Sequence, residues 1–471
     1  MSEAAELDVT AHPEPPIPVR DEEEHLNPDF IAAVETAIRA NDQYGLRELA
    51  ADLHEADTGD LLETLESEDR ASFIRLLGDD FDYTALTEID EAVRLQLLEE
   101  LPNDVIAEGL EDLDSDDAVY ILEDLDEDDQ AAILEGLPYA DRAQLQKALD
   151  YPEDSAGRRM QSEFIAVAPF WTVGQTIDYM REARDLPDSF YEIYVVDPKF
   201  KLLGSVHLDK ILRTKRKEKV TSIMEETRQA VLATEDQEET ARRFERYNLV
   251  SAAVVDENER LVGVLTVDDI VDVIQEEAEE DIRALAGVGD EEISDSVVTI
   301  ARSRFTWLVV NLGTAILASV VIALFEDTIE AMVALAVLMP IVASMGGNAG
   351  TQTMTVAVRG IATQELSARN MLRVLNREVL VSMLNGIALA VLIGITAWLW
   401  FSSPGLGIVI GGAIVINMLF AGLSGLLIPI VLDRVNVDPA IASSVFVTTV
   451  TDVVGFFAFL GIAALWFGLP L

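Results

Sequence analysis

Val447-Thr448-Thr449-Val450-Thr451-Asp452-Val453-Val454-Gly455 lies within the last apolar stretch of the chain, residues 440–471, in which Asp452 is the only charged residue. A carboxylate inside a membrane span costs a few kcal/mol, so it normally faces a cavity or an ion pathway rather than lipid. The stretch therefore predicts a membrane helix with Asp452 on a face that a cation reaches.

Working outward, the C-terminal third contains five apolar stretches, and each reaches the roughly 20 residues that cross a bilayer. They are residues 305–325, 331–358, 379–403, 405–432 and 440–471. Ser402-Ser403-Pro404-Gly405 interrupts a run of uncharged residues and predicts a tight turn between the third and fourth spans. These features predict a membrane domain of five helices.

The arginines around these stretches predict their orientation. They precede the first span or lie in the second-to-third and fourth-to-fifth connections, at Arg302, Arg304, Arg359, Arg369, Arg373, Arg377 and Arg434. By the positive-inside rule, the N-terminal domains are cytoplasmic and the C-terminus lies outside the cell membrane.

Charge separates this membrane domain from the rest of the chain. Residues 305–471 contain five Arg and eight Asp or Glu, a net charge of −3, so residues 1–304 carry −49 of the total −52. Such acidity excludes nucleic acid as a partner, because neutralising phosphates requires clustered Lys and Arg, and it favours cations. A solvating surface explains many of these carboxylates equally well. The chain has no Cys, which excludes disulfides and thiolate metal sites.

Residues 28–155 show apolar residues at helical spacing in short acidic units, for example 104–113, 117–125 and 129–137. Helices of two or three turns cannot bury their apolar faces alone, so neighbouring units are expected to stack into an all-α superhelix.

Residues 156–275 contain a repeat. The pattern from Tyr194 to Ile211 recurs from Ala253 to Ile270, and it predicts a buried strand, a turn closed by Gly, a second strand and a helix capped by Asp. A helical stretch precedes each copy, at residues 172–183 and 237–247. This repeat resembles a tandem pair of cystathionine-beta-synthase-type (CBS) domains. The resemblance implies a regulatory α/β module for adenosine nucleotides or ions, with Thr266 and Asp269 as a ribose-binding Thr-x-x-Asp; helix capping is the alternative role of this aspartate.

An acidic helix is predicted to follow, over residues 267–286. Its carboxylates repel one another at i,i+3 and i,i+4 spacing, and multivalent cations would relieve that repulsion. A solvated acidic linker is the alternative interpretation.

The second span contains Gly346-Gly347-Asn348-Ala349-Gly350, a small-xxx-small pattern that permits close helix approach. Pro340 and the glycines can also release backbone carbonyls from the helical ladder, and a helix-packing seam is the alternative interpretation. In the fifth span, one helix face is expected to hold Asp438, Val445, Thr448, Thr449 and Asp452, with the two carboxylates about 21 Å apart.

The candidate ligands in the spans are all oxygen donors, and such donors favour a hard cation. Mg2+ keeps several of its waters, so one carboxylate per chain suits a hydrated ion, and a dimer would supply two copies of Asp452.

Taken together, the chain resembles the MgtE family of magnesium channels and transporters from about residue 28 to its end. The resemblance rests on the order of domains, on residues 151–160 before the CBS pair, on Gly-Gly-Asn-x-Gly-x-Gln in the second span and on 438–440 and 448–452 in the fifth. It implies a non-enzymatic homodimer in the lipid bilayer, closed by intracellular Mg2+ through a plug helix beneath the pore.

The resemblance further implies that Asp452 holds the hydrated ion in the pore. The pore candidates are Asp452, Asn348, Thr448, Thr449, Asp438, Gly346 and Gly347. The sensor candidates for Mg2+ are Asp269, Asp272, Glu277, Glu280 and Asp281. ATP is a candidate ligand of the CBS pair.

The expected organisation is a multidomain membrane protein: a disordered acidic tail (1–27), a helical acidic N-domain (28–155), two CBS domains (156–216 and 217–275), a connecting plug helix (276–303) and a five-helix transmembrane domain (304–471). Two other functions fit the same residues: a CBS-regulated membrane receptor in which Asp452 serves helix packing, and a broader divalent-cation transporter that also carries cobalt or manganese.

Overall fold

The structure is a computed structural model. It describes residues 17–470 except 52, 112, 124, 184–185, 188, 227–228, 287, 289–296, 367–369 and 436. The chain divides into two compact units, residues 1–274 and 275–471. Each unit is considered by itself below.

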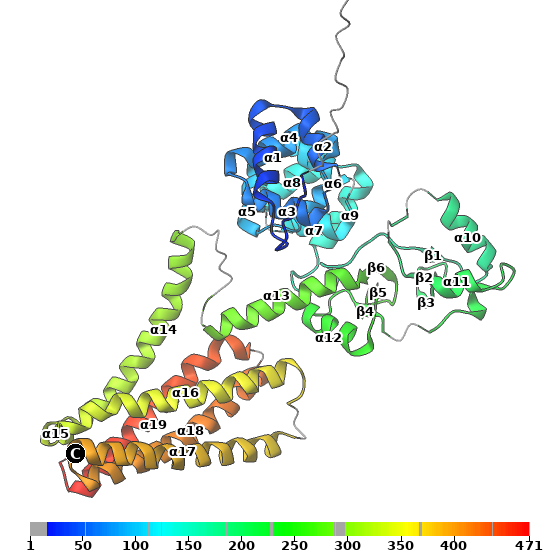
Figure 1. Cartoon of the computed structure of the whole chain (residues 1–471). Coiled ribbons are helices and arrows are strands. Elements are labelled where there is room, and N and C mark those ends of the chain that lie inside the picture. Colours follow the sequence, from blue (N-terminus) through cyan, green and yellow to red (C-terminus); the bar gives the residue numbers. More distant parts are fainter. Residues whose placement is uncertain are drawn as a thin grey trace, which may run out of the picture. The chain divides into compact units, whose positions relative to one another are not determined.

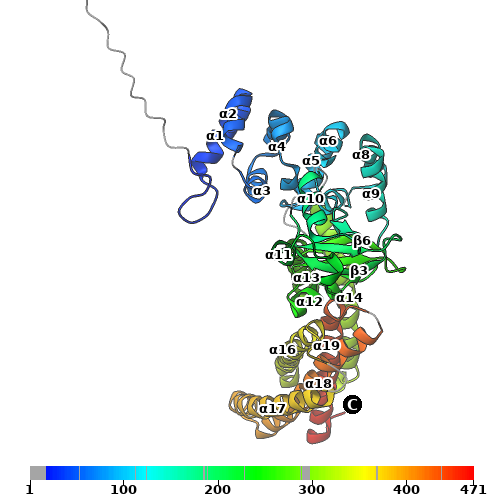
Figure 2. The same ribbon diagram turned by 90° about the vertical axis from the view of Figure 1, so that its right-hand side faces the viewer.

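The first unit begins with short helices, which stack in succession from α1 to α9 (Figures 1 and 2). They are α1 (Pro28–Ala40), α2 (Gln43–Ala50), α3 (Glu55–Thr64), α4 (Ser67–Leu77), α5 (Glu91–Glu100), α6 (Asn103–Glu111), α7 (Ser115–Glu123), α8 (Glu127–Gly136) and α9 (Tyr139–Leu149). Their apolar faces form one continuous core that includes Phe30, Leu97 and Ile121. The expected stack of short acidic helices is therefore present.

Aspartates begin several of these helices, as their sequence predicts. The Asp126 side chain accepts hydrogen bonds from the backbone amides of Asp128 and Asp129 at the start of α8. A carboxylate at this position also interacts favourably with the positive end of the helix dipole.

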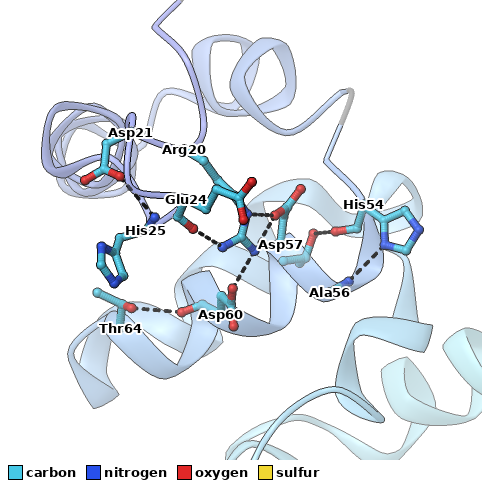
Figure 3. A network of polar contacts seen from close by, with 10 residues as sticks. Arg20, Asp21, Glu24, His25, His54, Ala56, Asp57, Asp60 and Thr64 are labelled. Carbon is cyan, nitrogen blue, oxygen red and sulfur yellow. Dashed lines mark hydrogen bonds and ion pairs between the residues drawn. The ribbon is translucent and has the colours of Figure 1, made fainter. Parts of the chain in front are cut away.

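The prediction of a disordered tail is wrong for residues 17–27; the tail's first residues, 1–16, lie outside the described part of the chain. Arg20 forms ion pairs with Asp57 and Asp60 of α3, each at 2.6 Å (Figure 3). Val19 and Leu26 also pack against the helical core. Composition alone missed this segment because one arginine and two apolar residues dock it onto an acidic helix.

The CBS region contains two three-stranded sheets of the same topology, β1-β2-β3 and β4-β5-β6, each with one parallel and one antiparallel pairing. The first copy consists of β1 (Ala166–Val167), α10 (Val173–Glu182), β2 (Glu192–Val196), β3 (Leu202–His207) and α11 (Leu208–Arg213). The second consists of β4 (Val231–Leu232), α12 (Gln237–Tyr247), β5 (Ser251–Val255), β6 (Leu261–Thr266) and the start of α13 (Val267–Ala286). The repeat and its preceding helices are confirmed.

The roles of Gly and Asp in this repeat differ from the prediction. Asp256 makes the turn, because its carboxylate accepts from the amides of Asn258 and Arg260, each at 2.8 Å. Gly263 lies inside β6, where a Cβ would lie 2.8 Å from the Gln161 carbonyl oxygen. Gly is thus needed for close strand approach rather than for the turn. Asp268 and Asp269 lie in the first turn of α13, and the Asp269 carboxylate accepts from the backbone amide of Thr266 just before the helix, so Asp269 caps α13 from within its first turn.

The second unit contains the long apolar helices, of which five in the described residues are long and apolar enough to cross a membrane. They are α14 (Val297–Ala323), α16 (Ala334–Ala362), α17 (Met371–Phe401), α18 (Pro404–Arg434) and α19 (Pro439–Phe467); the short α15 (Glu326–Ala331) joins the first two. Figure 1 shows α16 to α19 side by side. The helix α18 packs against α16, α17 and α19 and is the most buried of the five.

The predicted turn between the third and fourth spans is confirmed. Helix α17 ends at Phe401, and Ser402 has a φ of 52°, in the left-handed region. The Ser403 hydroxyl then accepts from the Leu406 amide, with Pro404 at the first helical position. A left-handed residue followed by a capping Ser and a Pro reverses the chain within four residues.

Candidate ion pathway and acidic cluster

Asp452 lies in the middle of α19. Its side chain is half-buried, and its carboxylate has no hydrogen bond or ion pair among the described residues. Thr448, one turn earlier, is exposed, and the half-buried Thr449 donates its hydroxyl to the Val445 carbonyl at 2.6 Å. Residues four apart share a helix face, so Thr448 and Asp452 form a continuous polar strip.

Asp438 and Val445, the two other members of the predicted strip, do not lie on this exposed polar face. Asp438 precedes α19, and its carboxylate accepts a hydrogen bond of 2.7 Å from the Ala440 amide. It therefore caps the helix and does not lie on its face. Val445 is buried against the other helices. Helical spacing places Val445 near the strip but does not show which neighbour covers it.

The glycine-rich part of α16 stays helical, since α16 is continuous from Ala334 to Ala362 with Pro340 inside it. The glycines therefore do not interrupt the helix, whereas Pro340, which has no N–H, leaves the carbonyl four residues earlier without its helical hydrogen bond. Asn348 and Gln352 lie four residues apart on this continuous helix, so they share one face, and both are exposed. No described atom lies within 4 Å of a Cβ built at Gly347.

Gly346, in contrast, is a packing position: it is buried, and a Cβ there would overlap the side-chain amide of Asn417 on α18. Asn417 is a residue that reasoning from the sequence missed. It is fully buried and donates from Nδ2 to the Val342 carbonyl at 2.9 Å. The available signal was an Asn among apolar residues of the fourth span.

In the first unit, the start of α7 and the start of α13 lie close enough for their carboxylates to interact. We call Asp116, Asp117, Asp269 and Asp272 the acidic cluster. Burial, together with the neighbouring Asp269, raises the pKa of Asp117 to about 7. Burial likewise raises the pKa of Asp269 to about 6, although the Thr266 hydroxyl, which donates to its carboxylate, opposes this rise.

The same physical causes act on the other two members. Burial and the charge of Asp269 raise the pKa of Asp116 well above its usual value. Burial and Asp268 raise the pKa of Asp272, while Arg159 lowers it. Like charges close together in a partly buried place disfavour ionisation, and a cation between them would favour it.

The remaining sensor candidates, Glu277, Glu280 and Asp281, lie on the later turns of α13. Eight residues separate Asp269 from Glu277, which is about 12 Å along the helix axis. The structure therefore does not bring all five candidates together. Within the described residues, no group of three or more His, Asp or Glu converges closely enough to hold a metal ion directly.

Thr266 lines a small cavity in the CBS pair, of about 10 Å³, which has room for about one water molecule. Glu192, Tyr194 and Ser251 also line it, and the Tyr194 and Ser251 hydroxyls are buried without a well-formed hydrogen bond in the described part of the chain. Asp269 is not among the lining residues. The Thr266 hydroxyl nevertheless donates to the Asp269 carboxylate, so the two members of the Thr-x-x-Asp contact each other.

Three family models match the chain along its length: the MgtE intracellular N domain at residues 53–154, the CBS domain at 220–276, and MgtE, a divalent cation transporter, at 339–462. The chain is 34% identical over 313 residues to the magnesium transporter MgtE of Bacillus subtilis, covering 66% of this chain and 69% of that protein. The chain belongs to the MgtE family. This confirms the resemblance drawn from the sequence.

A second curated relative and a solved structure are also similar to the chain. The magnesium transporter MgtE of Thermus thermophilus is 36% identical over 316 residues, with 66% of this chain and 70% of that protein covered. A solved structure described as the cytosolic domain of the Mg2+ channel MgtE in complex with ATP is 31% identical, with a TM-score of 0.49, and covers 52% of this chain and 99% of that one. The MgtE transporter model, residues 339–462, includes Gly346, Asn417 and Asp452. The curated relatives are transporters, a class without enzymes, and these matches indicate no enzymatic family.

Proposed function

We propose that this MgtE protein is a magnesium-selective channel of the cell membrane, in which Asp452 holds a hydrated ion and intracellular Mg2+ closes the pore. The observation that carries the proposal is the strip of Thr448 and Asp452, a carboxylate inside a candidate span without a described ion pair. An isolated carboxylate at this depth is costly unless a cation or water reaches it.

A homodimer completes the pathway. One carboxylate, with hydroxyl and amide groups such as those of Thr448 and Asn348, is too few for a dehydrated cage. Mg2+ retains waters and binds through few carboxylates, so two copies of Asp452 around a shared axis supply charge without stripping the ion. The arginines at the ends of the spans support, by the positive-inside rule, an orientation with the N-terminal domains in the cytoplasm and the C-terminus outside.

Gating rests on α13, whose two ends have different surroundings. Its start carries Asp269 and Asp272 of the acidic cluster. Near its end, Ala284 is buried with Met354 of α16 and Val447 of α19. One continuous helix therefore links a group of repelling carboxylates to the apolar helices that flank Asp452.

In this scheme, Mg2+ relieves the repulsion within the acidic cluster and holds α13 in the closed position. Loss of the ion restores the repulsion, and the helix leaves the pore helices. Because no three carboxylates converge on one point in the described residues, we propose that the ion binds through its own waters.

ATP is a proposed second ligand, at the CBS cavity. The Tyr194 and Ser251 hydroxyls are buried in a cavity with room for about one water molecule, so the base or ribose would enter only after the lining side chains move. The Thr266 hydroxyl donates to Asp269 and could accept a hydrogen bond from the ribose. Glu192 in the cavity wall disfavours phosphates there, so the phosphate chain would point outward or carry Mg2+. We expect Thr266→Ala to weaken ATP binding in a calorimetric titration.

The decisive experiment replaces Asp452 with Ala in protein reconstituted into vesicles. We expect Mg2+ uptake to fall to background, because no other described carboxylate lies in the middle of a candidate span. Asp433→Ala, at the exposed end of α18, is the matched control and should retain uptake. Full uptake by the Asp452 variant would refute the pore assignment.

The same vesicles test selectivity, since the matching family model is described as a divalent cation transporter. We expect Mg2+ to pass faster than Co2+ or Mn2+, because a hydrated-ion site without nitrogen ligands gives no advantage to softer ions. Equal rates for all three ions would favour the broader transporter. Absence of any flux would favour a receptor.

A further inference from the structure

Asn417 is a buried polar residue whose role helix packing alone does not explain. It lies within α18 and is fully buried. Its Nδ2 donates to the Val342 carbonyl of α16 at 2.9 Å, and its Oδ1 has no hydrogen-bond partner among the described residues. An unpaired buried oxygen costs stability, which an apolar residue of the same size would avoid.

Two glycines on two other helices make room for this amide. A Cβ at Gly346 of α16 would overlap its Nδ2. A Cβ at Gly455 of α19 would lie 2.7 Å from Nδ2 and 3.0 Å from Cγ. The carboxamide is therefore held between α16 and α19, and a larger residue at either glycine would displace the amide or the helix.

Gly455 lies three residues after Asp452, about one helical turn away on a neighbouring face. Any rotation or sliding of α19 that changes the contact at Gly455 also moves the Asp452 carboxylate. The seam continues on the other side of this aspartate, where a Cβ at Gly350 would lie 2.5 Å from Cγ1 of Val447. The methyl group of the buried Thr451 also lies near Gly350, and Asn417 is the amide in this close-packed seam.

We infer that Asn417 is a positioning residue of the ion pathway: its amide, bonded to α16 and pressed against Gly455, fixes the rotation and depth of α19 and therefore where Asp452 presents its carboxylate. This inference rests on the proposed function of Asp452. It predicts that disturbing the contact changes how the pore binds Mg2+, and not only how much folded protein is present.

The test is a double-mutant cycle in the full-length protein, reconstituted into vesicles, with uptake measured against Mg2+ concentration. Gly455→Ala should raise the half-saturating Mg2+ concentration about tenfold, because its methyl group displaces the Asn417 amide. Asn417→Ala should raise it less, since α19 gains freedom without a clash. The double variant should recover to within about threefold of the unchanged protein, because the methyl group then occupies vacated space.

Two matched variants isolate the contact. Gly461→Ala lies on the same helix, where the nearest atom to the new Cβ is Phe325 Cζ at 3.9 Å, and it should behave like the unchanged protein. Asn417→Leu keeps the approximate shape but removes the donor to Val342, so an increase in the half-saturating concentration assigns the effect to the hydrogen bond. Size-exclusion profiles and thermal stability are measured for every variant, and uptake is expressed per folded protein.

Three results would overturn the inference. Gly455→Ala and Gly461→Ala could have the same half-saturating Mg2+ concentration, or the double variant could have one as high as that of Gly455→Ala. The third is a loss of maximal uptake while the half-saturating concentration stays unchanged. The Asp452→Ala experiment separates this failure from that of the proposed function. If Asp452→Ala keeps full uptake, the pore assignment fails; if it abolishes uptake while the cycle shows no coupling, only the role of Asn417 fails.

Discussion

At the scale of residues, the carboxylates with raised pKa values matter most for regulation. Asp117, with a pKa of about 7, and Asp269, with a pKa of about 6, bind protons more tightly in the folded protein than in the unfolded chain. Their contribution to stability is fully present below their unfolded pKa, near 4, and is lost as the pH rises through 6 to 7. In the proposed mechanism, protons therefore compete with Mg2+ for the acidic cluster.

This competition predicts a pH-dependent response to Mg2+. Between pH 6 and pH 8 the ionised fraction of a group with a pKa of 7 rises about tenfold, so the Mg2+ concentration that half-protects the purified protein from protease should fall by about the same factor. Asp117→Asn should flatten this dependence. Asp129→Asn, an exposed position at the start of α8, should leave it unchanged. An identical midpoint at both pH values would argue against the acidic cluster as the sensor.

Asp438 gives a second prediction at this scale. As the N-cap of α19 it needs an acceptor, not a charge. Asp438→Asn should therefore keep uptake and stability, whereas Asp438→Ala should cost about 1 kcal/mol of stability, measured by thermal unfolding. Loss of uptake in the stable Asn variant would instead return Asp438 to the ion pathway.

At the scale of elements, the proposed gating depends on α13, which carries Asp269 and Asp272 near its start and Ala284 near its end. Its Ala284 is buried with Met354, Val358, Ala440 and Val447, while Ala278 on the same helix is exposed. A small apolar residue at position 284 allows the helix end to pack closely against α16 and α19.

Ala284→Glu should break this packing, because it buries a charge without a partner. We expect uptake that no longer falls when Mg2+ inside the vesicles, on the side of the N-terminal domains, is raised. Ala278→Glu adds the same charge to the same helix and should leave inhibition intact. If both variants are inhibited normally, the end of α13 does not hold the pore closed.

Elements also show how far sequence reasoning reaches. Periodicity and turn residues predicted the CBS strands, the helix α13 and the turn at Ser402, because these depend on residues near one another in the chain. Gly263 was assigned to a turn although it lies in β6, and Val445 to an exposed strip although it is buried. Both predictions were wrong for the same reason: each residue is covered by a segment that is distant in the sequence.

At the scale of the whole molecule, the proposed pathway needs two chains, and the absence of cysteine from the sequence makes this easy to test. Thr448→Cys places a single thiol on the polar strip, and mild oxidation should link two copies if these faces meet at the shared axis. A disulfide forms only when the two Cα atoms lie within about 7 Å. Leu465→Cys, on a side chain that is 83% exposed near the other end of α19, should remain monomeric on a denaturing gel. Equal cross-linking of both would show random collision.

The sequence by itself determined the acidic domains, the repeat, the apolar spans and the unusual position of Asp452, because charge, periodicity and hydrophobic length are properties of the chain alone. Only the tertiary structure decided what each polar group faces. Residues 17–27 contact α3, and Asp438 caps α19. Asp117 lies near Asp269, and Asn417 lies between Gly346 and Gly455. Burial and partners of a side chain depend on segments distant in sequence, and a linear pattern does not encode which of those segments approach.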